Sequence, residues 1–369
     1  MTTPTLLKNR LATDAIQCIA RVLAAIQPDF AHDDFIQQAH TGLEQLELKQ
    51  RVHHFIAILS LHLSDNFIQA VQVLQQVPNH WPTHNAQGDY GFAAWPLIDY
   101  VAVYGLKHPD IALQTLKILT PLFTAEFAIR PFLHHHFDLT YGYLQQWAID
   151  ENYHVRRLAS EGCRPRLPWG QRVPYLMTHP EVIIAVLEQL KDDDSDYVRR
   201  SVANNLNDIS KDYPETVVSL AQQWLAQPTA HRQAIIKHAT RGLVKSGHAD
   251  TLAMLGYSQA FHLQNVHFSI NKTHIRIDET VQLSLSFLLP EAQNLVIDYA
   301  LHLPRANGKK SIKVFKWKTG LLAAGEHQLS QNYTFKVITT RRYYLGEHDF
   351  EVLVNGQSLG LQTIVLVMT

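Results

Sequence analysis

The 369-residue sequence contains only two cysteines, Cys18 and Cys163, and no apolar run as long as a membrane span. Two cysteines without metal-binding spacing provide neither a disulfide framework nor a cysteine metal site. A membrane-spanning helix needs about 20 largely apolar residues in a row, so we expect none here. The N-terminal stretch also lacks the basic start, continuous apolar core and cleavage site of a signal peptide. These absences favour a cytoplasmic globular protein with no membrane partner.

The sequence also lacks a strong net charge, which is −1 when the histidines are neutral. Acidic residues outnumber basic ones in residues 1–150, and basic residues outnumber acidic ones in residues 251–369. Such a chain can bind nucleic acid only through a localised basic surface, because its overall charge attracts no polyanion. A hydrophobic content of 46% is typical of a folded protein, and the length is sufficient for two domains.

The first two thirds of the chain contain a series of helical patterns. Apolar residues recur at helical spacing in residues 7–26 and 35–63. Three later segments, residues 108–119, 179–190 and 213–225, each have a proline as their second residue, followed directly by an acid. Proline in the first helical turn loses no needed hydrogen bond, and the acid faces the positive end of the helix. The patterns predict helices over all of these segments.

Three longer segments, residues 144–162, 187–205 and 221–242, align with one another when three residues are inserted before the last helix. Paired helices that repeat every 35–45 residues or so are typical of a HEAT-type solenoid. In such a stack one helix of each pair lines a concave face. We therefore predict an α-helical HEAT-like-repeat solenoid over residues 1–259.

The aligned repeats place basic residues at one position, which is occupied by Arg157, Arg200 and Lys237. Four residues further on, the aligned position holds Glu161, Asn204 and Arg241. Four residues beyond that, it holds Pro165, Asp208 and Lys245. Residues four apart share a helix face, so we predict a basic stripe that two acids interrupt. The alternative is a solvated face, on which an exposed Arg157–Glu161 ion pair contributes only about 0.3–0.5 kcal/mol.

The segment RPRLPWG (residues 164–170) follows the first of these helices and cannot continue it, because Pro165 and Pro168 block a helix. Trp169 is therefore expected on a loop beside the stripe, or alternatively as a lid over the helix ends. Residues 204–214 add asparagine and lysine, which suit phosphate contacts or helix capping. A carboxylate among phosphate-binding residues suggests that a cation is stabilised there. An alkylated base or an oxocarbenium-like sugar is such a cation.

Several of these segments together resemble a known family. They are TAEFAIRPFL (124–133), HVRRLASEGCRPRLPW (154–169), YVRRSVANNLNDISKDYP (197–214) and KHATRGLVKSGH (237–248), with LELKQRVHHF (46–55) and GDYGFAAWPLIDYVAVYGL (88–106). They resemble the HEAT-like-repeat alkylpurine DNA glycosylases, and among them the AlkC family, over roughly residues 5–258. The resemblance implies hydrolysis of the N-glycosidic bond of 3-methylcytosine and 3-methyladenine during base excision repair. It also implies double-stranded DNA as the partner, and neither a metal nor a cofactor.

The resemblance further implies roles for individual residues. Glu126, Glu161 and Asp208 would line the site with acid, and Glu161 would stabilise the sugar cation and orient water. Trp169 would form an aromatic wall against the lesion, and Arg157 would position Glu161 or the lesion phosphate. The expected DNA contacts of the helical part are Arg130, Arg164, Arg166, Arg200, Asn204, Asn205, Lys211, Lys237, Arg241 and Lys245. No lysine is evident as a Schiff-base nucleophile, so we expect a monofunctional glycosylase. We also expect the protein to be a monomer.

The last third of the chain changes to strand-like alternation. Seven strands are predicted, over residues 261–277, 280–289, 295–303, 311–318, 327–338, 348–356 and 359–369. This number of short strands predicts an immunoglobulin-like β-sandwich over residues 260–369, and Asn355-Gly356 predicts a tight turn. The basic segments 305–318 and 341–344 predict DNA contacts by Lys309, Lys310, Arg341 and Arg342. Lysines that guard a sheet edge are the alternative.

Two other functions remain open at this point. A HEAT solenoid can bind a protein partner through its concave face, because a fold does not dictate its function. A sensor of DNA damage would bind DNA without cutting it. The acids within the basic stripe, with Trp169 beside them, favour the glycosylase over the protein scaffold. The three histidines of FLHHHF (132–137) do not indicate a metal site, because adjacent residues of a helix point in different directions.

Overall fold

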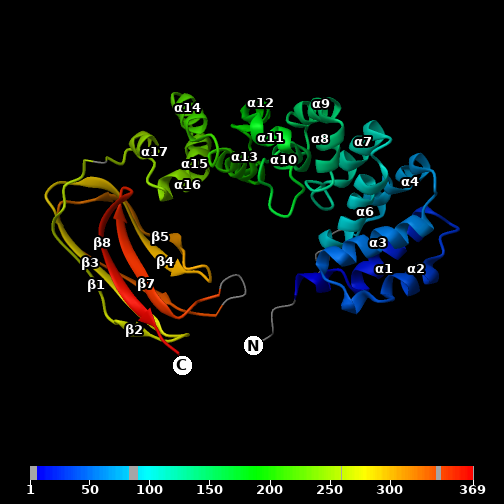
Figure 1. The fold of residues 1–369 in the computed structure, drawn as a ribbon. Helices are drawn as coiled ribbons and strands as arrows, with labels where there is room; N and C mark the ends of the chain where they lie inside the picture. The colour runs from blue at the N-terminus through cyan, green and yellow to red at the C-terminus, as the bar shows by residue number, and fades with distance from the viewer. Residues whose placement is uncertain (1–5, 83–89, 259, 338–341, 369) are drawn as a thin grey trace. The chain divides into compact units, whose positions relative to one another are not determined.

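The computed structural model describes residues 6–82, 90–258, 260–337 and 342–368 (Figure 1). The chain divides into two compact units. The first comprises Met1–Tyr213 and Pro228–Ala239, and the second comprises Pro214–Gln227 and Thr240–Thr369. The units therefore do not part at residue 259, where helices give way to strands. The domain boundary at that residue stays a prediction.

The first unit is helical throughout its described residues. Its helices are α1 (Thr13–Ile26), α2 (His32–His40), α3 (Leu48–His62), α4 (Phe67–Leu74), α5 (Val77–His80), α6 (Gly91–Tyr104), α7 (Pro109–Leu119), α8 (Arg130–His135), α9 (Phe137–Trp147), α10 (Tyr153–Gly162), α11 (Pro174–Thr178), α12 (Pro180–Leu190), α13 (Asp196–Ile209) and α15 (Ala230–Ala239). Short 3-10 turns lie at Leu7–Arg10 and Leu43–Gln45. Fully buried aromatic side chains such as Phe55, Phe132 and Trp147 fill the core between the helices.

The proline signals locate helix starts correctly. α7, α12 and α14 (Pro214–Leu225) begin at Pro109, Pro180 and Pro214, with an acid in each first turn. The pattern over residues 35–63 is not one helix. It divides into α2 and α3, because the chain turns between them at Gly42, whose φ of 74° lies in the left-handed region that glycine tolerates.

The second helices of the repeats pack side by side. α10 contacts α13 and α13 contacts α15, while α9 and α12 lie against them as the first helices of their pairs (Figure 1). This arrangement places Arg157, Arg200 and Lys237 on three successive helices. The third helix is shorter than predicted, because α15 ends at Ala239 and α16 (Arg241–Lys245) starts anew after the buried Thr240. Arg241 and Lys245 lie on α16 and belong to the second unit.

The strands of the second unit form two sheets. β1 (Gln264–Ile270), β3 (Thr280–Leu289) and β6 (Gly325–Thr334) form a three-stranded sheet. The other sheet has the order β2 (His274–Ile275), β8 (Gln357–Leu366), β7 (Gly346–Val354), β4 (Gln293–Pro304) and β5 (Lys310–Leu322). Only β2 and β8 pair in parallel; the other strand pairs of the described residues are antiparallel. The segment 261–277 contributes two strands rather than the one predicted, because the chain crosses from one sheet to the other between β1 and β2.

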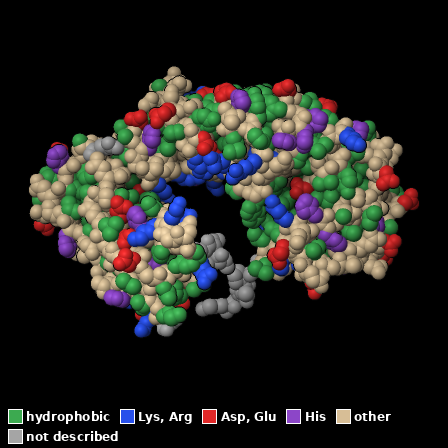
Figure 2. All heavy atoms as spheres, viewed as in Figure 1, with side chains coloured by type: hydrophobic (Ala, Val, Ile, Leu, Met, Phe, Trp, Pro, Cys, Tyr) green, Lys and Arg blue, Asp and Glu red, His purple; other side chains and the backbone are tan. Residues whose placement is uncertain are grey.

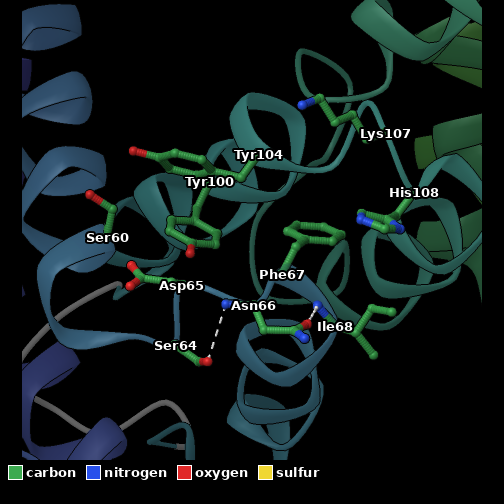
Figure 3. A pocket seen from close by; sticks show the side chains of 10 residues that line it. All are labelled: Ser60, Ser64, Asp65, Asn66, Phe67, Ile68, Tyr100, Tyr104, Lys107 and His108. Atoms are coloured by element: carbon green, nitrogen blue, oxygen red, sulfur yellow. Dashed lines mark hydrogen bonds between the residues drawn. The ribbon is translucent and has the colours of Figure 1, made fainter.

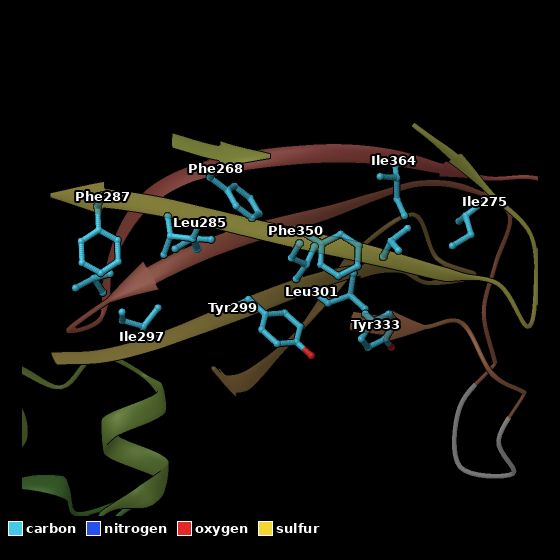
Figure 4. Packing of buried hydrophobic residues seen from close by; sticks show 14 of the residues in the cluster. Phe268, Ile275, Leu285, Phe287, Ile297, Tyr299, Leu301, Tyr333, Phe350 and Ile364 are labelled. Atoms are coloured by element: carbon cyan, nitrogen blue, oxygen red, sulfur yellow. The ribbon is translucent and has the colours of Figure 1, made fainter. Parts of the chain in front are cut away.

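Apolar side chains from both sheets form the core of this unit. Figure 4 shows Leu285 and Phe287 of β3 in the same core as Tyr299 and Leu301 of β4 and Phe350 of β7. The β3 residues alternate with more exposed ones, as the period of two requires, whereas β4 is buried continuously over residues 295–301. The predicted sandwich is therefore present, with eight strands in the described residues.

The predicted Asn-Gly turn joins β7 to β8. Asn355 and Gly356 both have positive φ, 45° and 79°, as the commonest two-residue hairpin turn requires. The turn also meets the end of α16, because a Cβ added to Gly356 would lie 2.3 Å from the Cα of Gly247. α16 and α17 (Ala249–Met254) are thus joined closely to the sandwich. None of the helices described here is long and apolar enough to cross a membrane.

Candidate functional site

Three carboxylates of the helical unit belong to a network of buried charges. Glu126 lies in the turn between α7 and α8, Glu161 in the last turn of α10, and Asp208 in the last turn of α13. Their exposed fractions are only 8%, 4% and 2%. A buried carboxylate is costly unless hydrogen bonds and opposite charges compensate it. The partners of these side chains therefore define the site.

Arg164 joins two of the carboxylates. Its Nη1 donates to Glu161 Oε1 at 2.6 Å, and its Nε donates to Asp208 Oδ2 at 2.9 Å. The side chain is 8% exposed, so it reaches from the loop after α10 into the protein rather than out to a ligand. The structure thus contradicts the predicted contact of Arg164 with the DNA backbone. Its guanidinium instead fixes the relative positions of Glu161 and Asp208.

Arg157 joins the remaining carboxylate to the network. Its Nη1 donates to Glu126 Oε2 at 2.7 Å, and its Nη2 lies 3.7 Å from Glu161 Oε1. Burial lowers the pKa of this guanidinium, but the charges of Glu126 and Glu161 raise it, and the net direction is upward. The guanidinium also lies over the ring of Tyr197, 4.5 Å from its centroid. The predicted Arg157–Glu161 pair therefore exists within a buried cluster and not on a solvated face.

Both oxygens of Glu161 are fixed. While Oε1 accepts from Arg164, Oε2 accepts from the hydroxyl of Ser201 at 2.6 Å, and that hydroxyl is 3.0 Å from Ser160 Oγ. Ser201 was not among the predicted site residues. A signal was present, because Ser201 aligns with the apolar Leu158 of the preceding repeat and so puts a hydroxyl at a core-facing position.

Asp208 reaches the rim of the cluster. Its Oδ1 accepts from Lys211 Nζ at 2.9 Å, and the Lys211 side chain is 50% exposed. Three buried carboxylates thus share two largely buried arginines, while the third cation, Lys211, is half in solvent. Glu126, Glu161, Asp208 and Arg157, all predicted as catalytic, meet in one network.

Trp169 extends outward from the loop after α10. Its side chain is 63% exposed and its φ of 64° is rare for a residue other than glycine. Its carbonyl oxygen accepts from Lys49 Nζ of α3 at 2.9 Å. A lid over helix ends would bury the indole, so this exposure contradicts the lid and agrees with an indole that is available to a ligand.

Two predicted DNA contacts of this unit lie in the core. Arg130 and Asn205 are both 0% exposed, which contradicts a role in contacting phosphate. Arg130 donates to the carbonyls of Gly162, Arg164 and Gln171 at 2.7–2.8 Å, and burial lowers its pKa to about 10. Asn205 donates to the Ser160 carbonyl at 2.8 Å. Arg130 thus holds the end of α10 and the loop that carries Trp169, and Asn205 holds the end of α10.

The other predicted contacts of the helical unit lie nearer the surface. Figure 2 shows Lys and Arg side chains gathered over the part of the unit that contains α10, α13 and α15 (compare Figure 1). Lys237 is exposed, and the exposed Arg200 pairs with Asp196. Arg166 pairs with Asp212, and Asn204 bonds to His238. These residues keep their predicted role, which the structure by itself does not test.

The predicted contacts of the second unit are also at the surface where they are described. Lys245, Lys309 and Arg342 are exposed, and Arg241 is partly exposed. Lys310 donates to Asp349, and Arg341 lies outside the described residues. β5, which carries the basic segment, is an edge strand, so edge protection is also consistent with its lysines.

Two other features of the helical unit are separate from this network. A hollow of about 440 Å³ lies where α3 ends, α4 begins and α6 ends (Figure 3). Tyr100 and Tyr104 line it, and burial raises the pKa of Tyr100 to about 12. None of the predicted site residues lines this hollow. Within the described part of the chain, His, Cys, Asp and Glu side chains form no group that suits a metal ion.

Known proteins share both the fold and the sequence of this chain. Residues 264–368 match the family model described as "Uncharacterised protein YhaZ, C-terminal Ig-like domain". The chain is 36% identical over 332 residues to the uncharacterized protein YhaZ of Bacillus subtilis (strain 168), and the match covers 89% of this chain and 90% of that protein.

A solved structure extends the similarity to the whole molecule. The alkylpurine DNA glycosylase AlkC of Pseudomonas fluorescens, solved bound to DNA containing an abasic site analog, is 36% identical. It matches with a TM-score of 0.91 over 98% of this chain and 100% of that one. Fold and sequence thus define a helical-repeat protein with a C-terminal Ig-like domain. The chain belongs to the AlkC family.

Proposed function

We propose that this protein is a monofunctional DNA glycosylase. It hydrolyses the N-glycosidic bond of cationic N3-alkylated bases, 3-methylcytosine and 3-methyladenine, in double-stranded DNA. The observation that carries the proposal is Glu161, a buried carboxylate with both oxygens fixed, in a network with Glu126 and Asp208. The loop that carries the exposed Trp169 follows the helix of Glu161, α10. The similarity to AlkC, a DNA glycosylase whose structure contains abasic-site DNA, supports it.

The chemistry of the leaving group explains why such a site suffices. A base alkylated on N3 is cationic, so when the C1′–N bond breaks, its electron pair neutralises the base. No strong general acid is then required. The sugar that remains is oxocarbenium-like, and a fixed carboxylate in a water-poor site stabilises that charge. Water adds to C1′ and passes its proton to a carboxylate, which leaves an abasic site and a neutral base.

In this proposal the residues of the network take different parts of the reaction. Glu161 faces the sugar cation, and Glu126 and Asp208 add negative charge and accept the proton of the attacking water. Arg157 and Arg164 keep the carboxylates in fixed positions, so little reorganisation is needed when charge develops. The indole of Trp169 attracts a cation with about 0.5–2 kcal/mol. The surplus of carboxylates over buried arginines favours a positively charged transition state.

The basic surface binds the DNA backbone in this proposal. Arg166, Arg200, Lys211 and Lys237 lie at or near the surface of the helical unit, where a phosphate can approach them. Each neutralised phosphate releases counterions, so affinity falls as salt rises. The acids of the site are buried and arginine-paired, which limits their repulsion of the phosphates.

The monofunctional part of the proposal depends on lysine. Among the described residues of the network, Lys211 is the one lysine, and its ammonium is bonded to Asp208. A lyase would form a Schiff base between such an amine and C1′. We expect no covalent adduct when borohydride is added during excision; an adduct that disappears in Lys211→Arg would refute this part.

The decisive experiment is excision from a labelled duplex with a single 3-methylcytosine, followed by alkaline cleavage of the abasic site. We expect the wild type to cut, and Glu161→Gln to be slower by about a hundredfold or more, because a fixed charge at the transition state is removed. Glu181→Gln, an exposed glutamate of α12, serves as the matched control and should cut normally. Salt-sensitive binding without excision of either base would indicate a damage sensor, and absence of DNA binding would indicate a protein scaffold.

A further inference from the structure

Two buried serine hydroxyls lie beside Glu161 in the carboxylate network. Ser160 belongs to α10 and Ser201 to α13, and the two residues are only 0% and 2% exposed. In the aligned repeats Ser201 takes the place of the apolar Leu158. A hydroxyl in a protein core is costly unless it is hydrogen-bonded. The hydrogen bonds of these two hydroxyls must therefore compensate their burial.

The contacts determine which hydroxyl donates to which acceptor. The Ser201 hydroxyl lies 2.6 Å from Glu161 Oε2, and a charged carboxylate only accepts, so the serine is the donor. A hydroxyl has one proton, so Ser201 accepts in its 3.0 Å contact with Ser160 Oγ, and Ser160 donates. Ser160, Ser201 and Glu161 thus form a chain of hydrogen bonds that ends on the carboxylate. In such a chain each bond polarises and strengthens the next.

The serine chain complements the arginine on the other oxygen of Glu161. Arg164, from the loop after α10, donates to Oε1 at 2.6 Å, whereas Ser201, from the helix of the next repeat, donates to Oε2. Donors on both oxygens fix the orientation of the carboxylate plane. A hydrogen bond donated to the charged form of an acid also favours that form over the protonated one. The neighbouring repeat therefore contributes to both the orientation and the charge of Glu161.

We propose that Ser201 is a positioning residue of the reaction. Its hydroxyl holds Glu161 in the orientation that faces the sugar and keeps this carboxylate charged, and Ser160 supports it from α10. The inference rests on the proposed function, in which Glu161 must be charged to stabilise the sugar cation. Ser201 acts only through Glu161, so it sets the lower end of the pH range in which the protein excises bases.

The test is the pH profile of single-turnover excision from a duplex with a single 3-methylcytosine. In Ser201→Ala the maximal rate should fall about tenfold, and the acidic limb of the profile should move to higher pH by about one unit, because a hydrogen bond to the charged form is lost. Ser160→Ala keeps the bond to Glu161, so its limb should move in the same direction by less. Ser210→Ala is the matched control, because this buried hydroxyl at the end of α13 donates to the carbonyl of Asn207. Its profile should be that of the wild type.

The pH profile separates positioning from a packing defect, which lowers the amount of active protein but does not move the acidic limb. Ser201→Thr keeps the hydroxyl and should restore the wild-type limb. A wild-type limb in Ser201→Ala, or an equal shift in Ser210→Ala, would overturn the inference.

Urea titrations of the same proteins test the serine chain without excision. Relative to wild type, Ser201→Ala should lose more stability near pH 8 than near pH 4, because the hydroxyl stabilises the charged carboxylate. Equal losses at the two pH values would count against the role of Ser201 alone. Absence of excision by the wild type, with the expected urea result, would count against the proposed function and leave the hydrogen-bond chain in place.

Discussion

The helical unit contains buried carboxylates in two different surroundings. Glu161 and Asp208 each accept hydrogen bonds from Arg164, and each has a further donor on its other oxygen. Asp99 has one donor, the indole of Trp95, and burial raises its pKa to about 7. Ion pairing compensates the first two charges, whereas the charge of Asp99 is compensated only in part. Their effects on stability should therefore differ.

The raised pKa of Asp99 predicts a pH-dependent stability. Between about pH 4 and pH 7 the folded protein keeps a proton on Asp99 that the unfolded chain has released, so the free energy of unfolding falls as pH rises through this window. Asp99→Asn removes the ionisation. At pH 8 the variant should unfold at higher urea than wild type, and its free energy of unfolding should be larger by an amount on the order of 1–4 kcal/mol. Near pH 4 the free energies of unfolding of the two proteins should converge. Urea titrations at pH 4, 6 and 8 test this, and parallel profiles would contradict it.

Family motifs in the sequence pointed to the acids that meet in the network but not to all of their partners. Glu126, Glu161, Asp208 and Arg157 were found through family motifs and do meet in one network. Arg130, Arg164 and Asn205 were assigned to DNA because a sequence shows that a side chain is polar and not whether it is buried. Arg130 stands in the apolar segment FAIRPFL, which was a sign of burial.

At the scale of elements, the loop between α10 and α11 is held from several sides. Buried Arg130 donates to the carbonyls of Gly162, Arg164 and Gln171, and Lys49 of α3 donates to the carbonyl of Trp169. Trp169 keeps a left-handed backbone conformation that costs energy outside glycine, and such a conformation persists only where the surroundings hold it. The loop therefore presents its indole in one preferred position.

This geometry predicts a positioning role for Lys49. Lys49→Met removes the bond to the Trp169 carbonyl, so the indole should lose its fixed position and single-turnover excision should slow about tenfold or more. DNA affinity should change little, and Lys49→Arg should restore part of the rate. Lys8→Met, which removes a partly exposed lysine paired with Glu47, is the matched control. Wild-type rates in Lys49→Met would show that the loop holds Trp169 without this bond.

Local sequence signals predicted where helices and strands lie better than they predicted the breaks within them. Proline followed by an acid located the starts of α7, α12 and α14, and alternation located six of the predicted strands. The breaks at Gly42 and at Thr240 were not predicted, because apolar spacing continues across them. The division of residues 261–277 into β1 and β2 depends on pairing with two different sheets, which is a long-range property.

At the scale of the whole molecule, the prediction to test is that basic residues of the second unit contact DNA. Deleting residues 260–369 would be a poor test, because α14, α16 and α17 group with the strands and would lose their packing. Charge variants preserve that packing. Lys309→Ser combined with Arg342→Ser should lower DNA affinity and reduce the slope of log affinity against log salt by about 0.9 for each phosphate that is no longer neutralised. Lys336→Ser is the exposed control in the same unit. An unchanged slope would leave edge protection as the role of these charges.

The division of the chain into units also sets an order of assembly during synthesis. α14 belongs to the second unit, yet α15, which is made after it, belongs to the first. As the chain leaves the ribosome, the first unit becomes complete only when α15 has emerged. α14, whose buried residues include Val217 and Trp224, emerges earlier, and α17, which contacts α14, emerges later still. A nascent chain of this protein therefore carries an uncovered apolar helix for an interval, which makes that stage a natural point for chaperone binding.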